Sequence, residues 1–439
     1  MKHIQKIFKT KSNKTYFIFA LAPYFISLVI FVFLNFYNSG VLSFELDFLL
    51  KILSPLFFSL SFFMIYRAFA KIKILRNLFS YSLFFLISIF SFLGLASNIN
   101  GSHAETSNIF IYGLSFYSAL LAFKAHQNNL QFSDLFVASN PLLLISGPIS
   151  VFFSKVSFGL SKRINYFFPF IFIGFFFFKV ISAPMTYYLN MVSFTEPLTI
   201  LLFAFLFRVF LYFNFAGISL MIFGIFGILG RRIPLNFTQP FSSRNVIEFW
   251  RSWHVTLSIV LRELFFLPSK KKFNSTYLSI FIVYLASAAW HGMSLNFIFW
   301  GFFHASIFIL TSFILKKGLK ILPIAIFLIA IPFGDIMFTD TNIPRLLIKL
   351  SNFWSIDFYS GFSMSSFLVA ILETPKYVLA STFVALFIIS VEFFGMRNKL
   401  VAKRNYKFLR TNLSLSIMLI LMVLLISGQG WEYAAYGQR

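Results

Sequence analysis

The sequence predicts an all-α membrane protein that crosses the bilayer about eleven times. Hydrophobic residues make up 59% of its 439 residues, and charged residues make up only 11%. Apolar runs of about 15 to 25 residues recur along the chain, and a hydrocarbon core roughly 30 Å thick needs about 20 residues of helix. Lysine and arginine gather in the short loops between these runs, which orients the spans. Residues 1–439 are therefore expected to form one integral membrane domain.

Composition also excludes several classes of protein. The formal net charge of +24 would favour nucleic-acid binding in a soluble protein, but here the cations flank apolar runs, where they meet anionic lipid headgroups. We therefore expect membrane lipids as partners, and no nucleic acid. The sequence contains no cysteine, which excludes disulfides, thiolate metal sites and an acyl-cysteine intermediate.

The N-terminal part of the chain, residues 1–134, is expected to contain four spans. A lysine-rich segment precedes an apolar run that ends near Tyr37. This run is too long for a signal peptide and lacks a convincing cleavage site, so it predicts an uncleaved span with a cytosolic N-terminus. The next apolar runs cover residues 52–66, 79–96 and 109–123.

The segment 135–153 is an interrupted apolar run with basic residues on both sides. It contains Pro141, Gly147 and Pro148, which disfavour a continuous helix. The pattern therefore predicts a re-entrant hairpin, in which protein covers the non-helical backbone.

Two further spans are predicted at residues 164–183 and 198–229. Asn214 and Gly217 lie inside the second run and predict a break in its helix. Non-helical backbone at this depth is tolerated where it is covered by protein or lines a water-filled cavity, so we expect the break to line a cavity. Arg208, in the same run, either lines that cavity or extends to the membrane interface.

The polar side chains are most concentrated between Arg244 and Leu315, which hold three of the six histidines and four of the six tryptophans. A helix is predicted over residues 244–267, because Asn245 can cap its N-terminus and Glu248 can reach back to the free amides. We expect this helix on the cytosolic side of the membrane or in a re-entrant position.

On that predicted helix, Trp250 and His254 would share one face, and Arg251 and Arg262 would share another. The arginines either attract an anionic ligand or anchor the helix to lipid phosphates. Pro268 and the lysines at 270–272 are expected to end the helix in a cytosolic loop.

His291 follows a short apolar run, Tyr277 to Ala289, which gives roughly 20 Å of helix. The histidine should therefore lie within the depth of the bilayer, beside Gly292, which removes side-chain bulk next to the imidazole. An ionisable residue there is a functional candidate, although a histidine bonded to a neighbouring helix for packing is the alternative. Desolvation favours a neutral imidazole, which can accept a proton.

The remaining runs complete the expected topology. Residues 339–376 form the longest predicted extracytoplasmic segment, and their mixture of aromatic and charged residues predicts an interfacial amphipathic piece. The remaining predicted spans cover residues 277–290, 293–315, 321–338, 377–395 and 411–427.

Two blocks in this stretch resemble the membrane-bound O-acyltransferase family, in particular its bacterial branch for alginate O-acetylation and teichoic-acid D-alanylation. The family's first block is close to F-W-R-x-W-H-x-x-L-S followed by R-D and an aromatic residue, and its second block is W-H-G followed by N-F and W-G-x-x-H. The corresponding residues here are Phe249, Trp250, Arg251, Trp253, His254, Leu257, Ser258, Arg262 and Glu263, then Trp290, His291, Gly292, Asn296, Phe297, Trp300, Gly301 and His304.

Weaker matches lie upstream, at Asn140 to Ile149, at Asn214 to Gly217 and at Pro234 to Phe241. The resemblance covers about residues 135–340, flanked by N-terminal spans in 1–134 and C-terminal spans in 341–439. It implies a bundle of about eleven transmembrane helices, with re-entrant and interfacial helices, around a central tunnel.

The resemblance further implies that His291 is the catalytic residue and that His254 is functionally required. His254 either orients a substrate or helps the proton move, with a structural role as the alternative. The chain contains no H-E-x-x-H motif, so no metal site is predicted. The other candidate donor or tunnel residues are Trp250, Arg251, Trp253, Arg262, Glu263, Trp290, Asn296 and Asn214.

By this resemblance, the protein would be an acyltransferase of the bacterial plasma membrane without a bound cofactor. It would move an acyl group, expected to be acetyl from cytosolic acetyl-CoA, to a hydroxyl of an exported polysaccharide or peptidoglycan through an extracytoplasmic transferase partner. D-alanyl transfer from a carrier protein to teichoic acid is the nearest alternative, and a polymer or lipid transporter is a more distant one. Glu263, Leu264, Asn214 and Ser269-Lys270 depart from the family pattern, so the sequence does not select a subgroup.

Overall fold

A computed structural model describes residues 20–29, 46–85, 118–151, 154–193, 195–292, 294–353 and 374–395, with 414, 417, 418, 420 and 421. These parts of the chain are predominantly helical and contain five helices that are long and apolar enough to cross a membrane. This agrees with the predicted all-α membrane class, while the count of about eleven spans stays a prediction. Most of the predicted spans at 109–123 and 411–427, and residues 354–373, lie outside the described residues.

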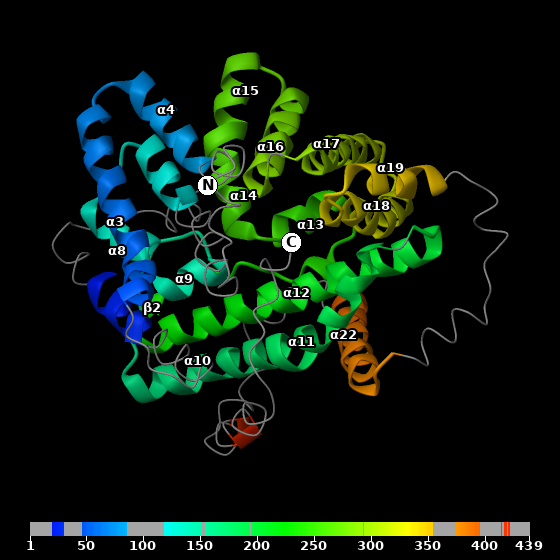
Figure 1. The fold of residues 1–439 in the computed structure, drawn as a ribbon, viewed down its shortest axis with the longest axis horizontal. Coiled ribbons are helices and arrows are strands. Elements are labelled where there is room, and N and C mark those ends of the chain that lie inside the picture. Colours follow the sequence, from blue (N-terminus) through cyan, green and yellow to red (C-terminus); the bar gives the residue numbers. More distant parts are fainter. Residues whose placement is uncertain are drawn as a thin grey trace.

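The N-terminal helices α3 and α4 form a hairpin beside two much shorter helices, α8 and α9 (Figure 1). The short pair replaces a continuous span in the segment predicted to be a re-entrant hairpin. Asn140 separates the two helices and caps the second, because its Oδ1 accepts a hydrogen bond from Leu142 N at 3.1 Å. The bounds are Leu46–Phe69 for α3, Lys73–Phe84 for α4, Phe132–Ala138 for α8 and Pro141–Ser146 for α9.

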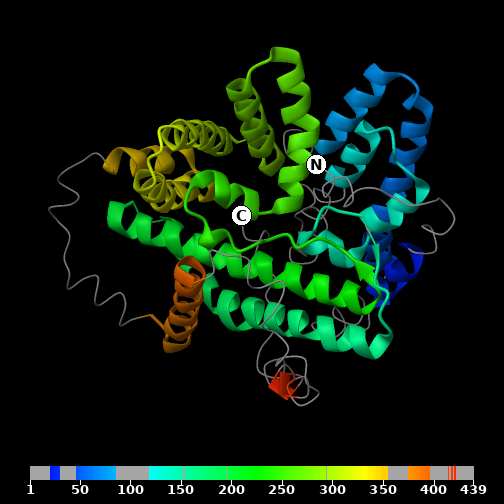
Figure 2. The same cartoon turned by 180° about the vertical axis from the view of Figure 1, so that it is seen from behind.

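Helix α12 (Pro197–Ile228) lies at the centre of the molecule, since its buried side chains belong to both hydrophobic clusters of the core. It runs antiparallel to α10 (Leu160–Phe175), and the two lie side by side in Figures 1 and 2. Gly174 and Gly217 allow this close approach, because a Cβ on Gly217 would lie 2.8 Å from the Gly174 carbonyl oxygen.

The predicted break at Asn214 and Gly217 is wrong, because α12 is helical throughout. Gly217 serves helix packing, and the Asn214 side chain donates to Ser182 Oγ at 3.4 Å rather than competing for backbone groups. The irregular backbone lies instead in the preceding segment. After α10 the chain forms a π-helix at Phe176–Ser182, α11 at Ala183–Met185 and a 3₁₀ helix at Thr186–Ser193.

A two-stranded antiparallel pair joins the start of α10 to the end of α12. Strand β1 (Ser154–Lys155) pairs with β2 (Arg231–Arg232), so that Lys155 lies opposite Arg231. The start of α10 and the end of α12 therefore lie on the same side of the molecule, although Lys155 and Arg231 are 76 positions apart in the sequence.

The predicted single helix over 244–267 is broken in the structure. The chain leaves helical geometry at Trp253 and His254, where His254 adopts the left-handed conformation with φ 44° and ψ 54°. Trp250 and His254 therefore do not form an i, i+4 pair, and Arg251 and Arg262 lie on different helical segments. The observed segments are a 3₁₀ turn at Pro240–Ser242, α13 at Val246–Ser252, α14 at Val255–Leu261, a π-helix at Arg262–Phe266 and α15 at Leu267–Phe273.

Both ends of this region are defined by local sequence. Asn245 Oδ1 accepts from Glu248 N at 2.9 Å, and the Glu248 carboxylate accepts from Arg244 N at 2.9 Å, which confirms the predicted cap. The lysines at 270–272 were expected in a loop, but they lie in the last turn of α15, where cations favour the helix dipole. Pro268 is in the first turn of α15, a position that proline tolerates, and Asn274 ends the helix in the left-handed conformation.

The C-terminal half follows the predicted apolar runs closely. Figure 2 shows α13 between α12 and the helices that follow α15, and α13 contacts both α17 and α18. Helix α19 is the described part of the predicted interfacial segment. The bounds are Thr276–His291 for α16, Leu295–Lys316 for α17, Ile321–Thr339 for α18, Ile343–Asn352 for α19 and Lys376–Gly395 for α22.

Candidate functional site

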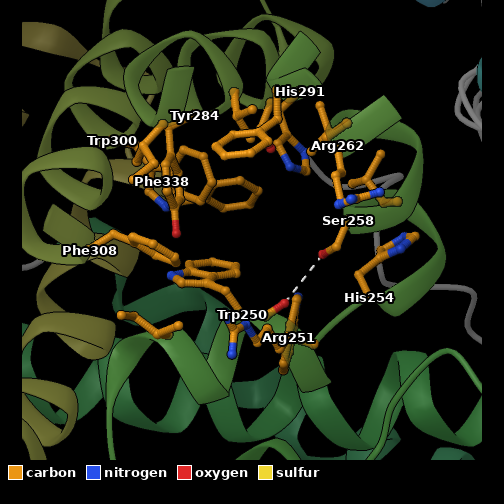
Figure 3. A pocket seen from close by; sticks show the side chains of 18 of the residues that line it. Trp250, Arg251, His254, Ser258, Arg262, Tyr284, His291, Trp300, Phe308 and Phe338 are labelled. Atoms are coloured by element: carbon orange, nitrogen blue, oxygen red, sulfur yellow. Dashed lines mark hydrogen bonds between the residues drawn. The ribbon is translucent and has the colours of Figure 1, made fainter. Parts of the chain in front are cut away.

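A cavity of about 540 Å³ lies where α13, α14, α16 and α17 meet above α12. In Figure 3, Trp300 and Phe308 lie on one side of it, and Arg262, Ser258 and His254 lie on the other. Six of the predicted site residues border this cavity. They are Trp250, Arg251, Trp253, His254, Arg262 and His291.

His291 is the last residue of α16 and reaches the cavity from a cage of aromatic rings. Its imidazole centroid lies 4.9 Å from that of Trp290, 4.9 Å from that of Phe338 and 5.8 Å from that of Trp300. Gly292 ends the helix, and a Cβ there would lie 2.7 Å from the Phe297 ring. Glycine therefore lets the aromatic cage close around one side of the imidazole while the cavity touches another.

His254 lies at the break between α13 and α14. Its left-handed backbone conformation is uncommon for a residue with a Cβ and costs roughly 1–3 kcal/mol, so the surrounding structure must impose it. Hydrogen bonds from the next two residues do so: Val255 N donates to Asn236 O at 2.8 Å, and Thr256 Oγ1 donates to Asn236 Oδ1 at 2.8 Å. Thr256 Oγ1 also accepts from Ile149 N at 3.0 Å, which ties the break to the segment after α9.

The two histidines are linked through Trp290. Its ring centroid lies 6.2 Å from that of His254 and 4.9 Å from that of His291. Burial lowers the pKa of His254 to about 4, so this imidazole is neutral at neutral pH. The cavity is thus bordered by two imidazoles in mainly aromatic surroundings.

The arginines of the central region have different environments. Arg251 is exposed at the cavity wall, whereas Arg262 forms an ion pair with Glu263. Arg262 begins the π-helix, a form that is frequent at functional sites because its wider turn redirects side chains. Glu263 itself does not line the cavity, but its carboxylate accepts a hydrogen bond from Arg262, which does.

A buried ion pair beneath the cavity was not predicted from the sequence. Arg208 lines the cavity, which was one of the two alternatives expected for it. Its Nε donates to Asp335 Oδ2 at 2.7 Å, and its Nη2 donates to Asp335 Oδ1. The side chains are 5% and 0% exposed. The Arg208 guanidinium carbon lies 4.6 Å from the Trp253 ring centroid, so the pair supports the residue that precedes His254. The sequence does place one charged residue in each of two apolar runs, Arg208 in 198–229 and Asp335 in 321–338, and this could have indicated the pair.

Two predicted candidates hold helices together instead of lining the cavity. Asn214 is buried against Ser182, and Asn296 is buried and donates to Met337 O at 3.0 Å. Trp290 contacts both histidines without lining the cavity.

Several cavity residues were missed by the sequence analysis. Along α16, one face lines the cavity with the helical spacing that could have revealed it. The face consists of Thr276, Ile280, Val283, Tyr284, Ser287 and His291, and Phe308 and Ser312 of α17 complete this wall. The described residues contain no group of three histidine, aspartate or glutamate side chains that could hold a metal ion.

The structure therefore defines a multi-pass helical membrane protein with two histidines on one internal cavity. The family model of MBOAT, the membrane-bound O-acyltransferase family, matches residues 33–317. The chain belongs to this family, and both histidines lie within the matched region.

Curated relatives match shorter stretches. A probable alginate O-acetylase of Pseudomonas fluorescens is 38% identical over 97 residues, which cover 21% of this chain and 20% of the relative. A teichoic acid D-alanyltransferase of Bacillus subtilis is 30% identical over 169 residues, 35% of this chain and 43% of the relative. A peptidoglycan O-acetyltransferase of Helicobacter pylori is 37% identical over 97 residues, 21% of this chain and 18% of the relative. The chain thus spans less than half the length of these relatives.

Proposed function

We propose that this protein is an O-acyltransferase that moves an acyl group, acetyl from cytosolic acetyl-CoA, to a hydroxyl acceptor outside the bacterial plasma membrane. The observation that carries the proposal is the position of His291, enclosed by aromatic rings yet open to a cavity that His254 also borders. Family membership adds the reaction class.

The shape of the cavity supports a donor with a long arm. It follows α16 from Thr276 to His291, fifteen residues apart or about 22 Å of helix. At the Thr276 end, Lys270 Nζ donates to Thr276 Oγ1 at 2.7 Å, and more lysines follow in the same turn of α15. This basic end faces the predicted cytosolic side, where a thioester on an extended anionic carrier would enter.

The proposed chemistry is direct transfer with His291 as general base. The acceptor hydroxyl gives its proton to the imidazole as its oxygen bonds to the thioester carbonyl carbon. The carbon–sulfur bond then breaks, and the proton passes from His291 to the leaving thiolate. Trp300 Nε1 is buried, has no acceptor among the described residues and belongs to the ring beside His291, so it is available to stabilise the developing oxyanion.

The acceptor would be an exported polysaccharide or peptidoglycan, modified through a separate extracytoplasmic transferase. The names of the relatives support polymer modification but divide over the group transferred. The D-alanyltransferase gives the longest alignment of these three, which keeps D-alanyl transfer from a carrier protein as the second candidate.

Liposomes containing the purified protein, with an oligosaccharide acceptor and the extracytoplasmic transferase enclosed, would test the proposal. External acetyl-CoA carrying a labelled acetyl group should label the enclosed acceptor, and a D-alanyl-loaded carrier protein should not. Labelling by the carrier protein alone would establish the second candidate instead. Movement of an intact polymer across the bilayer without any acyl change would overturn both in favour of a transporter.

A further inference from the structure

The β1–β2 pair gathers five basic residues at one end of α10 and α12, and none of the five lines the cavity. We call this group the hairpin cation cluster. It consists of Lys155, Lys162, Arg163, Arg231 and Arg232.

The geometry of the cluster places like charges against each other. Lys155 and Arg231 are directly opposite in the antiparallel register, where side chains share a face about 5 Å apart and like charges destabilise the pairing. The Arg163 guanidinium lies against the backbone of Gly230, where a Cβ would collide with it and where φ is +79°, so only glycine is compatible. The next residue is Arg231, which brings a third cation to the same place.

Four of the five cations in the cluster have no carboxylate partner among the residues that the structure describes. These four are Lys155, Lys162, Arg163 and Arg232. Arg163 Nε is buried and donates no hydrogen bond to any described residue. Helix α10 starts here at Gly159 without a capping side chain and without an acidic residue in its first turn, so its dipole adds positive potential. These features together favour a bound anion.

Apolar side chains beside the cluster identify the kind of anion. Phe158, Leu160 and Ile164 are 42%, 57% and 37% exposed, and they lie in the same stretch as Lys162 and Arg163. Cations next to an exposed apolar strip match the boundary between the headgroups and acyl chains of a bilayer. An acidic protein surface would satisfy the cations but would leave this strip uncovered. We therefore propose that the hairpin cation cluster binds the phosphate of an anionic phospholipid, whose acyl chains lie along Phe158 and Leu160.

Native mass spectrometry of the full-length protein in detergent would test this site. Phosphatidylglycerol, phosphatidylcholine and inorganic phosphate are added in turn, and the bound adducts are counted. We expect phosphatidylglycerol to be retained at concentrations where the other two are not. Binding of inorganic phosphate as tight as that of phosphatidylglycerol would overturn the lipid assignment.

Charge variants locate the binding. The triple variant Lys155→Gln, Arg163→Gln, Arg232→Gln should lower phosphatidylglycerol affinity about a hundredfold, because each cation near an anionic surface contributes about a fivefold effect. The control removes the same charge from the end of α17 and the turn after it, as Lys316→Gln, Lys317→Gln, Lys320→Gln, all exposed, and should retain wild-type binding. Equal losses in both variants, or no loss in the first, would contradict the proposal.

A single substitution keeps the test valid if the triple variant does not fold. Arg232 is exposed, so Arg232→Gln should leave thermal unfolding unchanged and still weaken phosphatidylglycerol binding about fivefold. Unchanged lipid binding with loss of binding to an acidic carrier protein would assign the cluster to a protein partner and overturn the lipid site.

Discussion

Replacing Asp335 by asparagine should destabilise the protein more than any surface substitution. The carboxylate is fully buried and makes two hydrogen bonds to Arg208, whose side chain is 5% exposed. Removal of one partner of a buried ion pair leaves the other charge uncompensated, which costs about 3–5 kcal/mol. Because Arg208 borders the cavity and gains some hydration there, we expect a value near the lower limit, about 3 kcal/mol. That corresponds to roughly a 150-fold change in the unfolding equilibrium.

Equilibrium unfolding in mixed detergent micelles, followed by tryptophan fluorescence, measures this change. Glu196→Gln is the matched control, since it removes an exposed carboxylate at the start of α12 and should alter stability by less than about 0.5 kcal/mol. The double variant Arg208→Met, Asp335→Leu should recover most of the loss, because it leaves no unpaired charge. A single variant within about 1 kcal/mol of wild type, or a double variant no better than the single one, would refute the reasoning.

Three further outcomes follow from the site. Asn236→Ala removes the acceptor for Thr256 Oγ1, so the free energy of unfolding should fall by about 1–3 kcal/mol and acyl transfer should slow. Thermal unfolding and a transfer assay would measure these two effects. Full transfer activity would contradict the positioning role of Asn236. Since the pKa of His254 is lowered from 6.5 to about 4, the unfolded chain binds more protons between these values and stability falls as pH drops through this window. Urea or detergent unfolding at pH 7 and pH 4.5 should therefore show that the free energy of unfolding falls less for His254→Gln than for wild type. Equal decreases would refute the lowered pKa of His254. Gly292→Ala would press a Cβ against the Phe297 ring and should reduce transfer more than stability; an unchanged rate would count against the aromatic cage.

Much of the fold was predictable because apolar runs of helical length specify helices wherever they occur. The runs at 293–315, 321–338 and 377–395 became α17, α18 and α22 within a few residues. The cap at Asn245 was also predictable, since it depends only on residues within one turn.

The break at His254 was not predictable in the same way. A pattern of apolar residues favours a continuous helix through 244–267, and the left-handed turn is imposed by hydrogen bonds to Asn236 and Ile149, distant in sequence. The segment that contains Asn236 resembles the family pattern, but its role depends on tertiary contacts that the sequence does not show.

Asn214 illustrates the opposite error. A polar residue and a glycine in an apolar run were expected to break the helix. In the structure, the Asn214 side chain donates a hydrogen bond to Ser182, and Gly217 packs against Gly174 of the neighbouring helix α10. Sequence alone does not show whether a polar residue in a span serves packing or a cavity. The sequence also does not show that Asp335 is the partner of Arg208, because the two residues are 127 positions apart.

The central claim is that His291 accepts the proton of an acceptor hydroxyl inside the cavity. The most direct test compares the rates of acetyl transfer by His291→Gln and by wild type, with His126→Gln as a control histidine that does not line the cavity. The account predicts a loss of about 10²–10⁴-fold for His291→Gln, with unchanged thermal unfolding, and a change below about threefold for the control. A folded His291→Gln protein that transfers acetyl at more than about a third of the wild-type rate would contradict it.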